Sequence, residues 1–325
     1  MAAKLMKALR YGRYGGGVEG LKHVEIPIPS PKKDDVLFKL EAASLNPADC
    51  KIQKGMARPF LPRKLLFVPD VAGEVVEVGF GVQNFKVGDK VVTMLNFMMI
   101  VWDSERQKGG GLAECAVASK TLMVERPPEV SALEGATLPM AVGLKLEKNS
   151  TNKETNVLIT AASGGVGNIH VTASCGARNI ELVKSLGADE VIDYKTPEGY
   201  DVIHCATNIP WSTFEPNLSE HGKVIDINIL LVPLLVLPKG EDLECMLGSV
   251  RDGKIKAVID SKSPLAKAEE EWVKMMDRHA TGKIIVTSDK REHIGLCDVD
   301  LFIYVGLFVL AYPALQLLEC IFLET

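Results

Sequence analysis

The stretch that most constrains the fold is Val157–Gly167, where an apolar run enters a turn built from small residues. The run Val157-Leu158-Ile159-Thr160 is apolar or β-branched, as in a parallel strand that is buried on both faces. The small residues after it let backbone N–H groups approach a pyrophosphate. Ala162 replaces the first glycine of the G-x-G-x-x-G fingerprint, so a simple tight turn is the alternative interpretation. The residues expected to bind a dinucleotide are Ser163, Gly164, Gly165, Val166 and Gly167.

Length and charge limit the classes of protein that this chain can belong to. With 325 residues it has room for two domains with separate hydrophobic cores. Its 37 basic and 42 acidic residues give a net charge of −5, so no basic surplus can neutralise nucleic-acid phosphates, and no nucleic-acid partner is expected. The seven cysteines form no C-x-x-C pair, which favours a reducing compartment over a disulfide framework or a structural zinc cluster. Residues 1–10 have no apolar core, so no cleavable signal is expected.

The first part of the chain, up to residue 118, is rich in short strand patterns separated by glycines. Strands are expected at 35–44, 70–79, 87–92 and 109–117. Asn46-Pro47-Ala48-Asp49 follows the first of these and starts a turn or a short helix, since proline suits the first helical position. The pattern predicts a small β-barrel-like domain.

From about residue 119 the pattern changes to strands that alternate with helices. Strands are expected at 157–160, 170–173, 190–194, 200–205 and 222–227, and helices at 179–186, 241–251 and 264–279. This alternation predicts a mostly parallel sheet.

Five short motifs occur in the order in which they occur in one enzyme family. They are Asn46-Pro47-x-Asp49, Pro69–Gly73, Val87–Val91, Gly110–Glu114 and Ala161–Gly167. By these motifs the chain resembles the zinc-free quinone oxidoreductases of the medium-chain dehydrogenase/reductase superfamily, and among them the plant chloroplast envelope quinone oxidoreductase homologues. The resemblance covers roughly residues 4–286.

The resemblance implies an α/β fold with a GroES-like β-barrel domain and a Rossmann domain, which is a doubly wound parallel sheet. The implied domains are 1–118 (GroES-like, substrate and catalysis), 119–254 (Rossmann, NADPH binding), 255–286 (return to the GroES-like domain) and 287–325 (a tail outside the family). The implied activity is NADPH-dependent hydride transfer to a quinone or to the double bond of an α,β-unsaturated carbonyl. The implied partner is a small molecule, and a homodimer is expected because relatives pair. A chloroplast envelope or cytoplasmic location is expected on the same basis.

No catalytic metal is expected, because Asn46 and Pro69 stand where zinc-dependent relatives carry Cys and His. Hydrogen bonds must then polarise the substrate carbonyl. Asn46 is a candidate donor, since its position in the motif faces the nicotinamide in the family; a turn-stabilising residue before proline is the alternative. Lys51 is a candidate to hold a developing enolate or supply a proton, and a solvated surface lysine is its alternative. Asp49 is interpreted as mainly structural.

Residues 172–178, at the expected end of the second strand, contain no carboxylate that would repel a 2′-phosphate. Ser174 can donate a hydrogen bond to that phosphate and Arg178 can pair with it, so the residues favour NADPH over NADH. An ordinary exposed charge is the alternative for Arg178. The resemblance adds Tyr194, which matches a family position in contact with the same phosphate. Cys205 lies at a strand end over the expected adenine site, and a small buried cysteine is its other interpretation.

The main departure from the family pattern follows Gly167. A parallel crossover needs at least about 10–12 residues, whereas only Asn168 and Ile169 precede the strand expected at 170–173. The helix that would hold the pyrophosphate is therefore expected to be missing, which leaves a truncated Rossmann domain. This allows a rival function, a catalytically impaired relative that acts only as a binding or membrane-associated protein.

The apolar tail 287–325 also departs from the family pattern. Its uncharged run 301–318 reaches the lower limit for a transmembrane helix, about 17 residues. Three interpretations stay open for it, which are translated non-coding sequence, a tail anchor and a helix packed on an exposed core. Pro313 and the acidic flanks of the run weaken the anchor interpretation.

Overall fold

The computed structural model describes residues 4–55, 68–96, 110–143, 157–159, 173–175, 180–185, 191–193, 201–204, 224–226, 239–277 and 280–288. Contacts divide the chain into two compact units, Met1–Ser288 and Asp289–Thr325, and every described residue belongs to the first. The uncharged run at 301–318 thus lies outside the described residues. Within the described ranges, no helix has the length and apolar character needed to cross a membrane.

A mixed seven-stranded sheet forms the larger part of the described structure. Its order is β13-β14-β3-β4-β5-β7, and β6 also pairs with β3. The strands are β3 (Asp35–Leu45), β4 (Asp70–Val78), β5 (Lys90–Met94), β6 (Cys115–Ser119), β7 (Met123–Glu125), β13 (Ile259–Pro264) and β14 (Lys283–Thr287). The neighbours are antiparallel apart from β13 and β14, which are parallel. The strands expected at 35–44 and 70–79 are therefore confirmed.

Two of the expected strands begin later than the sequence indicated. The strand expected at 87–92 starts at Lys90, because Gly88 has a φ of +94° and turns the chain before it. The strand expected at 109–117 starts at Cys115. The residues before it approach another segment closely, since a Cβ on Gly111 would lie 2.2 Å from the carbonyl oxygen of Val68.

Strand β3 is central, because it pairs with β4, β6 and β14. Val36, Phe38 and Leu40 belong to the main apolar core and are almost fully buried. Strand β4 lies close to β3 at Gly73, where a Cβ would lie 2.2 Å from the carbonyl oxygen of Lys39. A glycine is thus required at this position for the two backbones to meet.

The amide side chain of Gln53 joins three segments that are distant in sequence. Helices α1 (Pro47–Gln53) and α8 (Ala268–Asp277) contact each other. Trp272, which is fully buried, donates its indole N–H to Gln53 Oε1 at 3.2 Å. Gln53 Nε2 donates to the carbonyl of Gly17 at 2.6 Å. The N-terminal hairpin, with its short 3₁₀ turn, is thereby fixed to both helices; its elements are β1 (Leu5–Tyr11), η1 (Val18–Gly20) and β2 (Leu21–Pro27).

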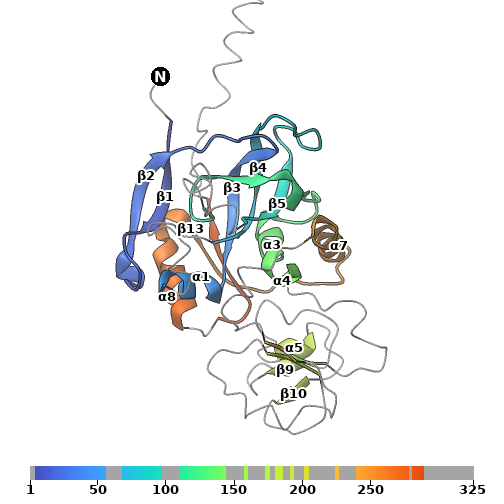
Figure 1. The fold of residues 1–325 in the computed structure, drawn as a ribbon. Helices are drawn as coiled ribbons and strands as arrows, with labels where there is room; N and C mark the ends of the chain where they lie inside the picture. Colours follow the sequence, from blue (N-terminus) through green and yellow to red (C-terminus); the bar gives the residue numbers. More distant parts are fainter. Residues whose placement is uncertain are drawn as a thin grey trace, which may run out of the picture. The chain divides into compact units, whose positions relative to one another are not determined.

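Three further helices pack with the same sheet (Figure 1). They are α3 (Ala132–Ala136), α4 (Pro139–Gly143) and α7 (Gly240–Arg251). Helix α3 contacts β3 and β4, and α7 contacts α4 and β7. Leu243 and Leu247 of α7 share an apolar cluster with Val92 and Ile285. Two further short helical turns in the described ranges are η3 (Lys120–Leu122) and η7 (Leu265–Lys267).

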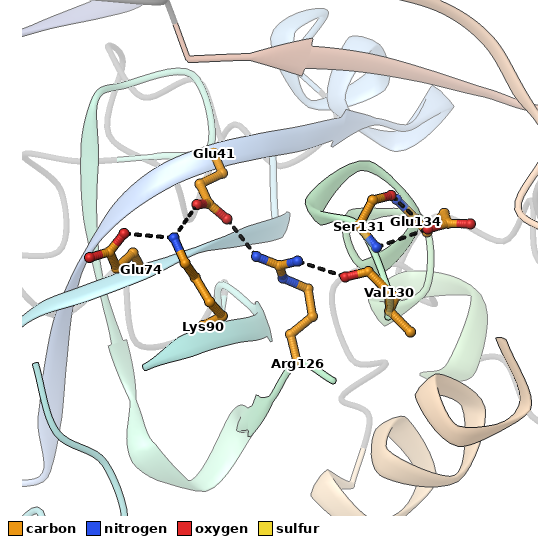
Figure 2. A network of polar contacts seen from close by, with 7 residues as sticks. All are labelled: Glu41, Glu74, Lys90, Arg126, Val130, Ser131 and Glu134. Atoms are coloured by element: carbon orange, nitrogen blue, oxygen red, sulfur yellow. Dashed lines mark hydrogen bonds and ion pairs between the residues drawn. The ribbon is translucent and has the colours of Figure 1, made fainter. Parts of the chain in front are cut away.

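An ion-pair network crosses the strands β3, β4 and β5 and reaches the start of α3 (Figure 2). Lys90 donates to Glu41 and to Glu74, each at 2.6 Å. Arg126 donates to the other oxygen of Glu41 and to the carbonyl of Val130, both at 2.6 Å. The adjoining cap of α3 is a reciprocal pair between Ser131 and Glu134. The network fixes the segment that connects β7 with α3 to the sheet.

A separate parallel sheet has the order β10-β9-β8-β11-β12. Its elements are β8 (Val157–Ile159), β9 (Ala173–Cys175), α5 (Ile180–Ser185), β10 (Val191–Asp193), β11 (Asp201–His204) and β12 (Val224–Asp226). All pairings are parallel, and in chain order the strands are arranged 3-2-1-4-5, as in a Rossmann fold. The doubly wound sheet and its helix at 179–186 are therefore confirmed.

The second strand of this sheet is described only in part. Its described part is Ala173–Cys175, which shares Ala173 with the strand expected at 170–173 and extends beyond it to Cys175. Its register places Ala173 beside both Ile159 of β8 and Val191 of β10, which fixes the strand between these two neighbours. Residues 160–172, between β8 and β9, lie outside the described residues. The expectation that the crossover helix is missing therefore stays a prediction.

Candidate functional site

The site begins at Asn46, where β3 ends and α1 starts. Asn46 has extended backbone angles (φ −126°, ψ 150°) and Pro47 is the first helical residue, as its fixed φ favours. The side chain of Asp49 reaches back and accepts a hydrogen bond from the backbone N–H of Asn46 at 2.7 Å. Asn46 and Asp49 form a capping box at the start of α1. The sequence motif thus builds a tight turn that fixes the position of the asparagine side chain.

The side chain of Asn46 is buried in a cluster of polar groups. Its Nδ2 donates to the carbonyl of Ser44 at 3.2 Å and to Asp70 Oδ2 at 3.0 Å. Its Oδ1 accepts a hydrogen bond from Lys283 Nζ at 2.8 Å. An ammonium group has no acceptor, so the amide oxygen must face Lys283 and the orientation of the amide is fixed. Both amide hydrogens are therefore engaged within the protein.

Asp70 is the second member of the cluster and is fully buried at the start of β4. Its Oδ1 accepts from the backbone N–H of Met140 in α4 at 2.9 Å. Its Oδ2 accepts from Lys283 Nζ at 3.3 Å, in addition to the bond from Asn46. The carboxylate thus connects the turn after β3, the first residue of β14 and helix α4. The register of the sheet brings Asn46, Asp70 and Lys283 together, since Ser44 pairs with Asp70 and Leu45 pairs with Ile284.

The electrostatics of the cluster are dominated by burial. Burial raises the pKa of Asp70, and the nearby Lys283 ammonium and its hydrogen bonds oppose this shift. Burial also raises the pKa of Asp49 to about 8, although its hydrogen bond from the Asn46 N–H lowers it. Asp49 Oδ1 and Ser44 Oγ are buried and have no hydrogen-bond partner among the described residues. At neutral pH, Asp49 is therefore mostly protonated and the cluster holds one ion pair, Asp70 with Lys283.

The cluster does not have the chemistry of a zinc site. Zinc prefers thiolate, imidazole and carboxylate ligands, whereas the turn offers an amide and Pro69 offers no side-chain ligand. The Asp70 carboxylate, which accepts a hydrogen bond from the Asn46 side chain, is already paired with the Lys283 ammonium. Within the ranges that the structure describes, no group of three or more His, Cys, Asp or Glu side chains could hold a metal ion. The expectation of a reaction without zinc stays a prediction.

The structure brings together only part of the site expected from sequence. Asn46 belongs to the buried cluster, and Lys51 is half-buried in the last turn of α1. Ser174 lies in β9, within the strand and not after it. The other candidates lie outside the described residues, namely Ser163, Gly164, Gly165, Val166, Gly167, Arg178, Tyr194 and Cys205.

Sequence reasoning missed Asp70 and Lys283 as members of the site. Asp70 was visible as a carboxylate inside the apolar run Val68–Ala72, which is unusual for a buried strand. Lys283 was visible as a charge at the start of the apolar strand 282–286. No pattern in the sequence connects the two, because they are 213 positions apart.

Comparisons with known proteins identify the family. The model of the alcohol dehydrogenase GroES-like domain matches residues 32–128, and the model of the zinc-binding dehydrogenase matches residues 200–286. The chain is 56% identical to the chloroplast envelope quinone oxidoreductase homolog of Arabidopsis thaliana, with 88% of this chain and 99% of that protein covered. The chain belongs to the medium-chain dehydrogenase/reductase superfamily. The recognition of the family from sequence motifs is therefore confirmed, and the protein is an oxidoreductase enzyme.

Two further relatives of this superfamily member are informative. The chain is 32% identical to the chloroplastic NADPH-dependent alkenal/one oxidoreductase of Arabidopsis thaliana, over 87% of this chain and 80% of that protein. The structure of the quinone oxidoreductase from Coxiella burnetii has a TM-score of 0.70 and 24% identity, and covers 88% of this chain and 100% of that one. This structural likeness confirms the fold, with its GroES-like and Rossmann-like domains.

Proposed function

We propose that the protein reduces quinones or the double bond of α,β-unsaturated carbonyls with NADPH and without a catalytic metal. The observation that carries this proposal is the buried cluster of Asn46, Asp70 and Lys283, in which an ammonium group stands against the carboxylate and amide of the motif. The names of the relatives support the substrate class, since one is a quinone oxidoreductase homolog and another an NADPH-dependent alkenal/one oxidoreductase.

The Rossmann strand order supports dinucleotide binding. The order of the strands reverses between β8 and β11, and ligands of such sheets bind outside the carboxyl ends of the strands at this point. Residues 160–167 directly follow β8 in the sequence. We propose that Ser163–Gly167 hold the pyrophosphate, and that Ser174, Arg178 and Tyr194 hold the 2′-phosphate. Cys205, directly after β11, would border the adenine.

The chemistry requires stabilisation of negative charge on the substrate oxygen. Bound NADPH would supply a hydride to the β-carbon of an enone or to a quinone. The protein must then orient the acceptor, exclude water and stabilise the oxyanion with preorganised donors. In this proposal Asn46 lies where the substrate reacts and orients Asp70 and Lys283. It does not itself donate to the substrate, because both of its amide hydrogens are already engaged. Lys51, in the last turn of the helix that Asn46 precedes, would hold the enolate or supply a proton.

We also propose a chloroplast location and a homodimer. The location follows from relatives whose names place them in the chloroplast or its envelope. The homodimer follows from the family resemblance alone.

Two measurements on the full-length protein test the proposal. A titration with NADPH, followed by nicotinamide fluorescence, should saturate at micromolar concentrations, and NADH should bind more weakly. A quinone and an enone should then each accelerate NADPH oxidation. In an Arg178→Leu variant, the affinity for NADPH should fall while that for NADH is unchanged, because only NADPH carries the 2′-phosphate. Absence of NADPH binding would favour the rival function, a catalytically impaired binding protein.

A further inference from the structure

We infer that Lys283 also donates a hydrogen bond to the substrate oxygen as negative charge develops on it. This inference rests on the proposed function and assigns a part of its chemistry to a residue of the return strand β14. It concerns a residue 237 positions away from the Asn-Pro motif.

A count of hydrogen-bond donors in the cluster leads to Lys283. The amide of Asn46 has two N–H groups, and Ser44 and Asp70 accept both. Lys283 has three N–H groups, and its described partners are Asn46 Oδ1 and Asp70 Oδ2. Among the described residues, one N–H of Lys283 thus remains for a ligand. Of these two side chains, only the ammonium can donate without the loss of an internal bond.

The position of the ammonium is fixed before any substrate binds. Asn46 Oδ1 and Asp70 Oδ2 both accept hydrogen bonds from Nζ, and Asp70 is itself fixed by the backbone N–H of Met140. The side chain of Lys283 is only 8% exposed, so little water competes for its hydrogen bonds. A donor that is held in place within a water-poor site stabilises a developing charge without reorganisation. This preorganisation is what a metal-free oxyanion site requires.

The charges of Asp70 and Lys283 also favour the addition of a hydride to the enone. Asp70 neutralises Lys283 in the absence of substrate, and burial keeps Asp49 mostly protonated at neutral pH. When a hydride adds to the β-carbon, the C=C bond breaks and its electron pair moves through the enone to oxygen. The oxygen then accepts the hydrogen bond from Lys283. Water supplies the proton that completes the reduced carbonyl, or the hydroquinone when a quinone is reduced, while NADPH is oxidised to NADP⁺.

The inference is tested with 4-nitrophenol, whose phenolate resembles the oxyanion and whose absorption reports its ionisation. The wild-type protein should bind the phenolate in preference to the phenol, so the bound ligand should ionise at a lower pH than the free ligand. A wild-type protein that leaves this ionisation unchanged overturns the inference, even if it oxidises NADPH. A shift that depends on Lys283 in a protein without turnover would overturn the proposed function, and would support only the binding of an oxyanion by Lys283.

Variants separate a direct contact from a structural role. Lys283→Met alone leaves Asp70 buried without its cation, so the double variant Lys283→Met/Asp70→Asn is the main test, since it removes both charges and retains an acceptor for Met140. It should lose the phenolate preference, and kcat with an enone should fall about 10²–10³-fold, with NADPH affinity unchanged. The matched control is Lys262→Met on the neighbouring strand β13, where the lysine is exposed; it should behave as wild type. A double variant with near wild-type kcat and phenolate preference would contradict the inference.

Discussion

Lys283 Nζ lies 2.8 Å from Asn46 Oδ1, and this hydrogen bond joins the last strand of the seven-stranded sheet to the turn after β3. The bond exists because β14 pairs with the end of β3, so that the first residue of one strand meets the residue after the other. The same ammonium contacts Asp70, which holds helix α4 through Met140. The candidate site is therefore also a structural junction, and its substitutions affect stability as well as activity.

Removal of the carboxylate charge at Asp70 should be strongly destabilising. In Asp70→Asn the new amide nitrogen faces the donors of Asn46 or Lys283, and the ammonium stays buried without its counter-ion. The free energy of unfolding should fall by about 3–5 kcal/mol, the usual cost of breaking a buried ion pair. Urea denaturation of the variant measures this loss. Asp252→Asn, at an exposed ion pair, is the control and should leave the urea midpoint close to that of wild type. Equal effects of the two substitutions would show that the buried pair is not formed.

The raised pKa of Asp49 predicts a dependence of stability on pH. The folded protein holds the proton of Asp49 up to about pH 8, whereas the unfolded chain releases it near 3.8. The contribution of this group to stability is thus largest below pH 4 and is lost as the pH rises to about 8. In Asp49→Asn, which retains an acceptor for the Asn46 N–H, this decline should be absent. Melting temperatures across this range measure it; an unchanged slope in the variant would mean that Asp49 is ionised throughout.

Two glycine substitutions should have opposite effects. In Gly73→Ala the new Cβ meets the carbonyl oxygen of Lys39 at 2.2 Å, so β3 and β4 must separate, at a cost of about 1–3 kcal/mol or more. In Gly248→Ala the Cβ meets nothing within 4 Å on helix α7, and the variant should be more stable by about 0.5–1 kcal/mol. The two urea midpoints should therefore move in opposite directions. A neutral Gly73→Ala would contradict the strand contact.

Arg126 should contribute to stability through geometry as well as charge. Its guanidinium bridges Glu41 and the Val130 carbonyl, which the single ammonium of a lysine does not reproduce (Figure 2). Arg126→Lys should therefore lower the free energy of unfolding by about 1.5–3 kcal/mol. Since the side chain of Arg126 is only 9% exposed, most of this loss should remain at high salt. The control Arg251→Lys, at an exposed pair, should change little; a loss for Arg126→Lys that disappears in salt would argue for a screened surface contact.

Local features were predictable from the sequence, whereas the meeting of distant residues was not. The strand 35–44, the helix that Pro47 starts and the parallel strands after residue 157 follow from alternation, proline and glycine signals, and the structure confirms them. The described part of β9 ends at Cys175, two residues beyond the expected end at 173. Its register with Ile159 and Val191 depends on distant segments and is not visible in the local sequence.

The site was predictable only where a motif supplied it. Asn46 was found because it stands beside Pro47 in a short motif, but the partners of its side chain depend on the pairing of β14 with β3. The sequence also favoured Asn46 as a donor, and only the hydrogen bonds to Ser44 and Asp70 reveal that its amide hydrogens are engaged. Contacts between residues more than 200 positions apart carry no local signature.

The most direct test of the account follows a label from cofactor to substrate. Chelator-treated, full-length protein is incubated with C4-deuterated NADPH and an enone, and the product is analysed by NMR. The account predicts that deuterium appears at the β-carbon, that the rate is unaffected by the chelator, and that NADPH is consumed in equal amount. A folded protein that transfers no deuterium to an enone and does not reduce a quinone, or that needs added zinc to do so, would contradict it.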